Sequence, residues 1–102
     1  MRIELLYFEG CPNVMATLER LNSILETSGL NCSVMQTHVV DDEMAQSVRF
    51  LGSPTVRING VDIEPSARSR IDFGIMCRTY DGSGVPPEDV IRLAIEEAEH
   101  AR

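Results

Sequence analysis

The residues of this chain that could carry chemistry are its three cysteines, Cys11, Cys32 and Cys77. An odd number does not suit a disulfide framework, so each thiol is buried filler, a reactive group or a soft-metal ligand. Cys11 stands out because Gly10 precedes it and Pro12 follows it, between an apolar run and an amphipathic stretch. At such a junction the free N–H groups and the positive dipole end of a helix favour a thiolate. The pattern therefore favours a reactive role for Cys11.

The expected roles of the other two cysteines depend on the predicted strands in which they lie. Cys77 is the best distal partner for Cys11, although a packed strand cysteine is an equal alternative, and sequence alone does not bring the two sulfurs together. Cys32 begins a predicted strand at the opposite edge, where burial is expected. The two histidines lack ligand spacing to any cysteine, so we expect no metal site, and no motif calls for a cofactor.

Hydrophobic periodicity predicts the elements that position these thiols. Strands are expected at 2–8, 31–40, 55–58 and 75–80. Helices are expected at 12–29, at 41–50 and from Pro86 or Pro87 onward. Between them, a loop with one helical turn is expected at 61–74 and a turn at 81–84. The order βαβα-ββα predicts one α/β domain over 1–102. Its opening strand–helix–strand implies a right-handed parallel crossover in a four-stranded mixed sheet with helices on both faces.

Composition excludes several classes of function. The net charge is -7 and all nine basic residues are arginines, which disfavours nucleic acid as a partner. The absence of lysine excludes Schiff-base chemistry. No run approaches the roughly 20 apolar residues of a membrane helix, and the first ten residues read as a strand and not as a signal peptide. These features favour a cytoplasmic protein with no membrane partner.

The segments Tyr7–Val14 (YFEGCPNV) and Gly52–Val56 (GSPTV) make the chain resemble the thioredoxin/glutaredoxin superfamily over nearly its whole length. The resemblance implies a thioredoxin-like fold in which Cys11 is the nucleophile. It also implies a cis-proline at Pro54, beside that nucleophile and exposing backbone for substrate docking. The substrate-binding residues implied in this way are Pro12, Ser53, Pro54 and Thr55.

A narrower resemblance is to small bacterial thioredoxin-family proteins with C-P-N, G-S-P-T, N-G-x-D and C-R-x-Y elements, some labelled alkylmercury-lyase-like. The departures are equally informative. Val14 occupies the position of the resolving cysteine in a C-x-x-C pair, no Trp precedes Cys11, and no Lys is present for a glutathione carboxylate. A dithiol cycle within one motif is therefore excluded.

Three hypotheses of function follow. In the leading one, Cys11 performs thiol-disulfide exchange with a disulfide-containing protein or small thiol, and Cys77 or an external thiol resolves the mixed disulfide. In the second, Cys11 and Cys77 handle a soft metal or organomercurial with Asp62 as proton donor. In the third, the domain is a binding module without turnover. A homodimer is left open.

Overall fold

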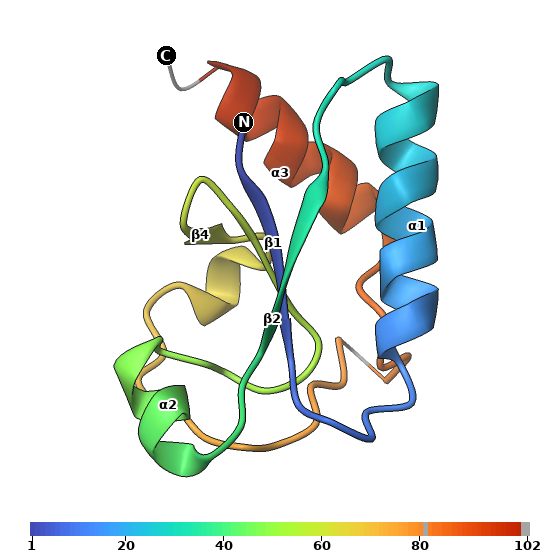
Figure 1. The fold of residues 1–102 in the computed structure, drawn as a ribbon. Coiled ribbons are helices and arrows are strands. Elements are labelled where there is room, and N and C mark those ends of the chain that lie inside the picture. The colour runs from blue at the N-terminus through green and yellow to red at the C-terminus, as the bar shows by residue number, and fades with distance from the viewer. Residues whose placement is uncertain (81, 101–102) are drawn as a thin grey trace.

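The computed structural model describes residues 1–80 and 82–100 (Figure 1). Within them the elements are β1 (Ile3–Tyr7), α1 (Val14–Thr27), β2 (Val34–His38), α2 (Asp42–Ser47), β3 (Thr55–Ile58), β4 (Val61–Asp62), a 3-10 turn (Pro65–Ala67) and α3 (Glu88–His100). The chain is thus an α/β protein with the predicted βαβα-ββα order.

A four-stranded mixed sheet in the order β2-β1-β3-β4 forms the centre of the molecule. β1 runs parallel to β2, whereas β3 is antiparallel to both β1 and β4. Leu6, near the end of β1, pairs with Thr55, the first residue of β3. The segment that follows β1 and the segment that precedes β3 therefore meet at the same edge of the sheet.

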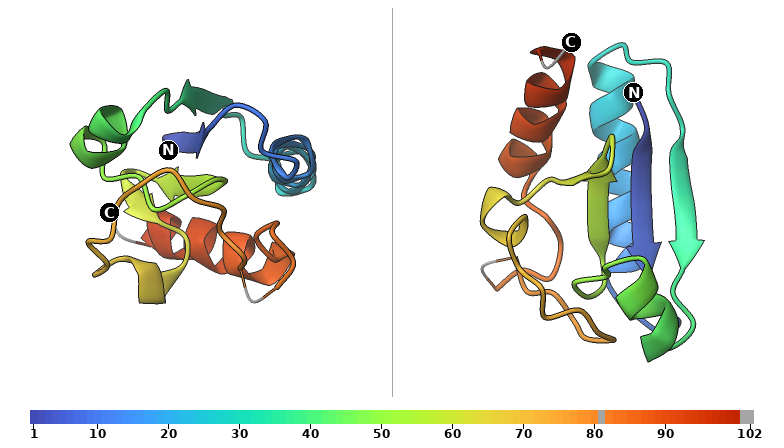
Figure 2. Two further views of the ribbon diagram at one scale, coloured as in Figure 1. Left: turned by 90° about the horizontal axis from the view of Figure 1, so that it is seen from below. Right: turned by 90° about the vertical axis from the view of Figure 1, so that its left-hand side faces the viewer.

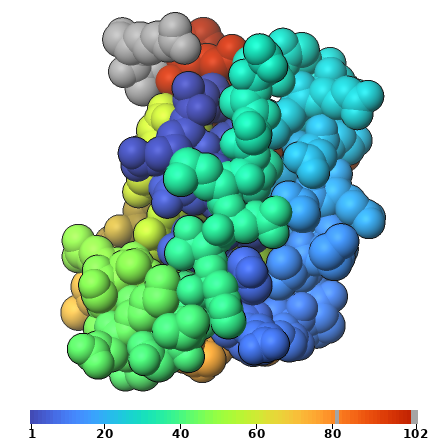
Figure 3. Space-filling view, viewed as in Figure 1, coloured from blue at the N-terminus to red at the C-terminus, as the bar shows by residue number. Residues whose placement is uncertain are grey.

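Helices cover both faces of the sheet, as predicted. On one face α1 and α3 pack together with β1 and β3 around a core that includes Ile3, Leu5, Leu21, Ile24, Val56, Ile58, Ile91 and Ile95. On the other face a smaller cluster consists of Leu6, Val39, Ala45 and Phe50, and Figure 2 shows α2 well away from α1 and α3. β2 is an edge strand whose side chains reach the surface along its length (Figure 3).

The helix ends follow local rules of capping. The Asp41 carboxylate accepts a hydrogen bond from the N–H of Met44 at 2.8 Å, which starts α2 at the predicted place. Gly29 takes the left-handed conformation (φ 69°) that ends α1. At the end of α2 the same conformation is adopted by an arginine, Arg49, with φ 59°.

Several predicted boundaries are wrong. The fourth strand is Val61–Asp62, which follows the Asn59–Gly60 turn, and not 75–80. That segment makes one isolated bridge, between Cys77 and Ser53, outside the strands of the sheet. α2 ends at Ser47, short of the predicted residue 50. α1 begins at Val14, with Asn13 as its N-cap, so Pro12 lies outside the helix.

The predicted turn at 81–84 falls partly outside the described residues. Within the described part, the N–H groups of Gly82 and Gly84 both donate to the carbonyl of Thr79, at 2.8 and 2.9 Å.

Candidate functional site

Cys11 lies beyond the end of β1, three residues before α1 begins. Its N–H donates to the carbonyl of Phe8 at 3.3 Å, and its thiol is free and partly exposed. The N-cap Asn13 makes no side-chain capping bond, so the first N–H groups of α1 are not satisfied by that side chain. The predicted placement of Cys11 between strand and helix is therefore confirmed.

The segment Ser53–Thr55 leads into β3 at this same edge of the sheet. The Ser53–Pro54 peptide bond is cis, as the resemblance implies. Thr55 is fully buried, and its hydroxyl donates to the carbonyl of Gly52 at 2.5 Å. The Ser53 hydroxyl is also buried, and no hydrogen-bonding partner for it exists among the described residues. A buried hydroxyl without a hydrogen-bonding partner is unfavourable for the stability of the fold.

Cys77 is held against this segment by backbone hydrogen bonds. The N–H of Ser53 donates to the carbonyl of Met76 at 2.8 Å, and the N–H of Arg78 donates to the carbonyl of Ser53 at 2.9 Å. Cys77 thus sits opposite Ser53 in a parallel bridge, with an exposed, free thiol. Both predicted catalytic cysteines belong to the same edge of the sheet and share no disulfide bond.

The side chain of Arg78 points inward and ties three segments together. Its guanidinium donates to Asp62 Oδ2 at 2.7 Å, to Glu64 Oε1 at 2.7 Å and to Thr55 Oγ1 at 3.2 Å. Its side chain is 3% exposed. Burial alone would lower the pKa of Arg78. The hydrogen bonds that its guanidinium donates to Asp62 and Glu64, together with the negative charges beside it, outweigh burial and raise that pKa above its ordinary value.

Tyr80 completes this arrangement. Its hydroxyl donates to the carbonyl of Pro54 at 2.5 Å, and the Arg78 guanidinium lies 4.5 Å from the centre of its ring. Arg78 and Tyr80 therefore hold the Ser53–Thr55 segment from its buried side. We call these two residues, with Asp62 and Glu64, the clamp.

The clamp was not predicted from the sequence. One feature of the sequence could have indicated it. Carboxylates alternate at positions 62 and 64, after the Asn59–Gly60 turn, and a buried arginine requires a carboxylate partner. The proton-donor role considered for Asp62 stays a prediction. Both of its carboxylate oxygens accept from Arg78 and one also accepts the N–H of Glu64, so Asp62 is a structural partner of Arg78.

The remaining predictions concern groups away from this edge. Cys32 is partly buried against the larger core cluster, near the start of β2, at the edge opposite Cys11. The residues described by the structure contain no group of three or more His, Cys, Asp or Glu side chains that could hold a metal ion. No helix in 1–80 or 82–100 is both long and apolar enough to cross a membrane.

Comparison of the chain with protein-family models, with curated proteins and with solved structures finds no match.

Proposed function

We propose that this protein is a thioredoxin-like thiol protein that performs thiol-disulfide exchange through Cys11. The observation that carries the proposal is the position of this free, partly exposed thiol, at the sheet edge where Ser53–Pro54–Thr55 enters β3. The strand order β2-β1-β3-β4, with one parallel and two antiparallel pairings, supports the thioredoxin-like assignment of the fold.

The proposed reaction uses the thiols of Cys11 and Cys77. The Cys11 thiolate attacks one sulfur of a substrate disulfide, forms a mixed disulfide with it and releases the other sulfur as a thiolate. The Cys77 thiolate, or an external thiol, then attacks the Cys11 sulfur and releases the second substrate thiolate. Two electrons pass from two thiols to the substrate disulfide, and an external dithiol or thiol pool returns the protein to its reduced state. The clamp positions the Ser53–Thr55 segment and takes no part in the electron transfer.

Oxidised glutathione, a small symmetric disulfide, tests this proposal. The reduced protein is incubated with it, quenched with acid and mapped by mass spectrometry without reduction. We expect the mixed disulfide on Cys11 first. In Cys77→Ser the mixed disulfide should persist, and in Cys11→Ser it should be lost.

Cys32→Ser is the matched control, because this thiol is also partly buried but lies at the opposite edge. Its removal should leave the rate of mixed-disulfide formation unchanged. The proposal fails if Cys11 reacts no faster than Cys32. If instead Cys77→Ser changes neither the rate nor the lifetime of the mixed disulfide, resolution by Cys77 is excluded and the external thiol remains.

A further inference from the structure

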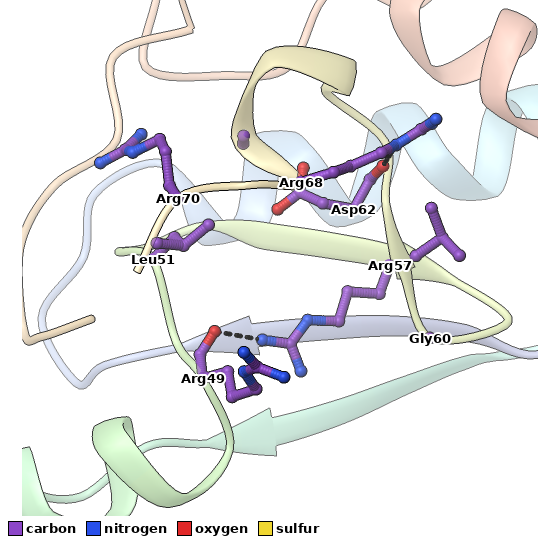
Figure 4. A pocket seen from close by; sticks show the side chains of 9 residues that line it. Arg49, Leu51, Arg57, Gly60, Asp62, Arg68 and Arg70 are labelled. Atoms are coloured by element: carbon purple, nitrogen blue, oxygen red, sulfur yellow. Dashed lines mark hydrogen bonds between the residues drawn. The ribbon is translucent and has the colours of Figure 1, made fainter. Parts of the chain in front are cut away.

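A second concave site lies away from Cys11, on the sheet face that carries α2. A cavity of about 290 Å³ is bounded by the turn after α2, by β3, by the β3–β4 hairpin and by the segment after the 3-10 turn (Figure 4). Its lining includes four of the nine basic residues of this acidic chain: Arg49, Arg57, Arg68 and Arg70. Such a concentration of guanidinium groups in one hollow is notable because the chain as a whole carries a net charge of -7.

Two of these arginines already have carboxylate partners. Arg68 pairs with Glu97 at 2.8 Å and Arg70 with Asp72 at 2.7 Å. Figure 4 shows both side chains extending away from the lower part of the cavity. They form the rim of the cavity, and their charges are balanced by these carboxylates. The positive charge that remains to bind a ligand is therefore that of Arg49 and Arg57.

Arg49 and Arg57 lie toward one another, with no carboxylate within 4 Å of either among residues 1–80 and 82–100 (Figure 4). Arg57 Nη2 donates to the carbonyl of Arg49 at 2.6 Å, which holds the two residues together. The one carboxylate lining the cavity, Asp62, is occupied by Arg78. Two neighbouring like charges thus lack an ion-pair partner, and most of their N–H donors remain available.

The desolvation of Arg57 adds a second argument. Burial is the main cause that lowers the pKa of Arg57 from its ordinary value. The charges of Asp62 and Glu4 oppose this shift, and the smaller effects of Arg78 and Arg49 add to it. A partly desolvated cation beside a like charge gains the most from a bound anion.

The backbone of Arg49 supplies an independent observation. Arg49 has φ 59°, and its neighbour Phe50 donates its N–H to the carbonyl of Ala45 at 2.8 Å, closing the end of α2. Glycine is the residue favoured at this position of a helix end, because a side chain there is strained. An arginine therefore occupies a place where local structure favours glycine. Arg49 lines the cavity, and its guanidinium carbon lies 5.5 Å from the centre of the Phe73 ring.

We propose that this cavity binds the phosphate group of a small phosphorylated compound, with Arg49 and Arg57 as its two ligands. A divalent oxyanion balances two unpaired guanidinium charges, and guanidinium N–H groups match phosphate oxygens in geometry. The cavity volume is close to the lower end of small-molecule sites, about 300 Å³, which fits a small compound. The proposal does not depend on the chemistry of Cys11.

Inorganic phosphate is the probe for the test. The full-length protein is titrated with phosphate at constant ionic strength while amide ¹⁵N–¹H shifts are followed. We expect saturable shifts at Arg49, Arg57 and Gly60. Arg49→Gly and Arg57→Gln should each raise the dissociation constant about ten-fold, the effect of losing one charge-assisted hydrogen bond.

Arg49→Gly is the sharpest variant, because glycine accepts the positive φ and the helix end is preserved. Arg49→Asn provides a second folded variant, because asparagine also adopts a positive φ. Arg92→Gln is the matched control, since it removes the same charge from the exposed face of α3, and it should change the dissociation constant less than about two-fold.

Three results would overturn the proposal. Arg49→Gly could bind phosphate as tightly as the natural protein, or Arg92→Gln could weaken binding as much as Arg49→Gly, which would indicate diffuse surface charge. Malonate could saturate the same signals at equal or lower concentration, which would assign the site to dicarboxylates.

Discussion

Arg78 and Asp62 form an ion pair in the interior of the protein, with Nη1 of the arginine 2.7 Å from Oδ2 of the carboxylate and side chains 3% and 7% exposed. The pair joins the segment that carries Cys77 to β4 and, through Thr55, to the start of β3. Its effect on stability is asymmetric, because a buried charge that loses its partner is far more unfavourable than the absence of both charges.

Replacement of Arg78 by methionine tests this asymmetry. The variant leaves Asp62 buried and unpaired, and we expect the free energy of unfolding to fall by about 3–5 kcal/mol. The double variant Arg78→Met/Asp62→Leu should be more stable than Arg78→Met alone. Urea unfolding followed by circular dichroism measures both. If Arg78→Met loses less than about 1 kcal/mol, the ion pair does not hold this edge together.

Gly52 tests how closely the Met76–Arg78 segment approaches the loop before β3. A Cβ atom at Gly52 would lie 2.8 Å from Met76 Cγ and 2.9 Å from the Met76 carbonyl oxygen, at a φ of 106°. Gly52→Ala should destabilise the protein by about 2–4 kcal/mol, the sum of backbone strain and overpacking.

Gly29→Ala is the control for that substitution. Its φ is also positive, but nothing lies within 4 Å of the added Cβ, so it should lose only the strain contribution, about 1–2 kcal/mol. Equal losses in the two variants would show that the close approach at Gly52 contributes nothing.

Tyr80 should give the stability a dependence on alkaline pH. Burial raises the pKa of its phenol, and the charges of Asp62 and Glu64 add to this, against the opposing charge of Arg78. The unfolded chain therefore releases this proton first, near pH 10, and the free energy of unfolding falls as the pH rises above that value. Below about pH 10 the contribution is fully present.

The measurement compares natural protein with Tyr80→Phe in urea unfolding from neutral pH to about pH 11. At neutral pH the variant should be less stable by about 1 kcal/mol, because the hydrogen bond to the Pro54 carbonyl is lost. The difference should shrink as the pH rises. A difference that stays constant across this range would contradict the assignment.

Ser53 and Thr55 are two buried hydroxyl residues for which opposite outcomes are expected. Ser53→Ala removes a hydroxyl without a partner among the described residues, so stability should be unchanged or higher by about 1 kcal/mol. Thr55→Val removes bonds to Gly52 and Arg78 and should lose about 1–3 kcal/mol. If Ser53→Ala is stable yet slows mixed-disulfide formation at Cys11, the hydroxyl serves the reaction and not the fold.

The helices and the first three strands were predictable from the sequence, because apolar spacing and capping residues such as Asp41 and Gly29 are local signals. Residues 75–80 were mistaken for a strand, since their apolar and β-branched content suits one. In the structure Arg78 and Tyr80 are buried by an ion pair and a hydrogen bond instead of a strand ladder. β4 was missed because two residues are too short to show a period.

The candidate site was predictable only in part. Cys11 and the Ser53–Thr55 segment were identified because each lies at a junction of elements. The approach of Arg49 to Arg57 depends on the turn after α2 reaching β3, a tertiary relationship that no local pattern encodes.

The connection between β4 and α3 contains a single 3-10 turn among its described residues and runs along the lower edge of the molecule (Figure 1). It is nevertheless attached midway by the clamp, while Ile71 is 76% exposed. A single cut after Arg70 would leave Cys11 on one fragment and Cys77 on the other, and the ion pairs of Arg78 with Asp62 and Glu64 would join the two fragments. The two thiols could then be produced, labelled or isotopically marked on separate chains of one native complex.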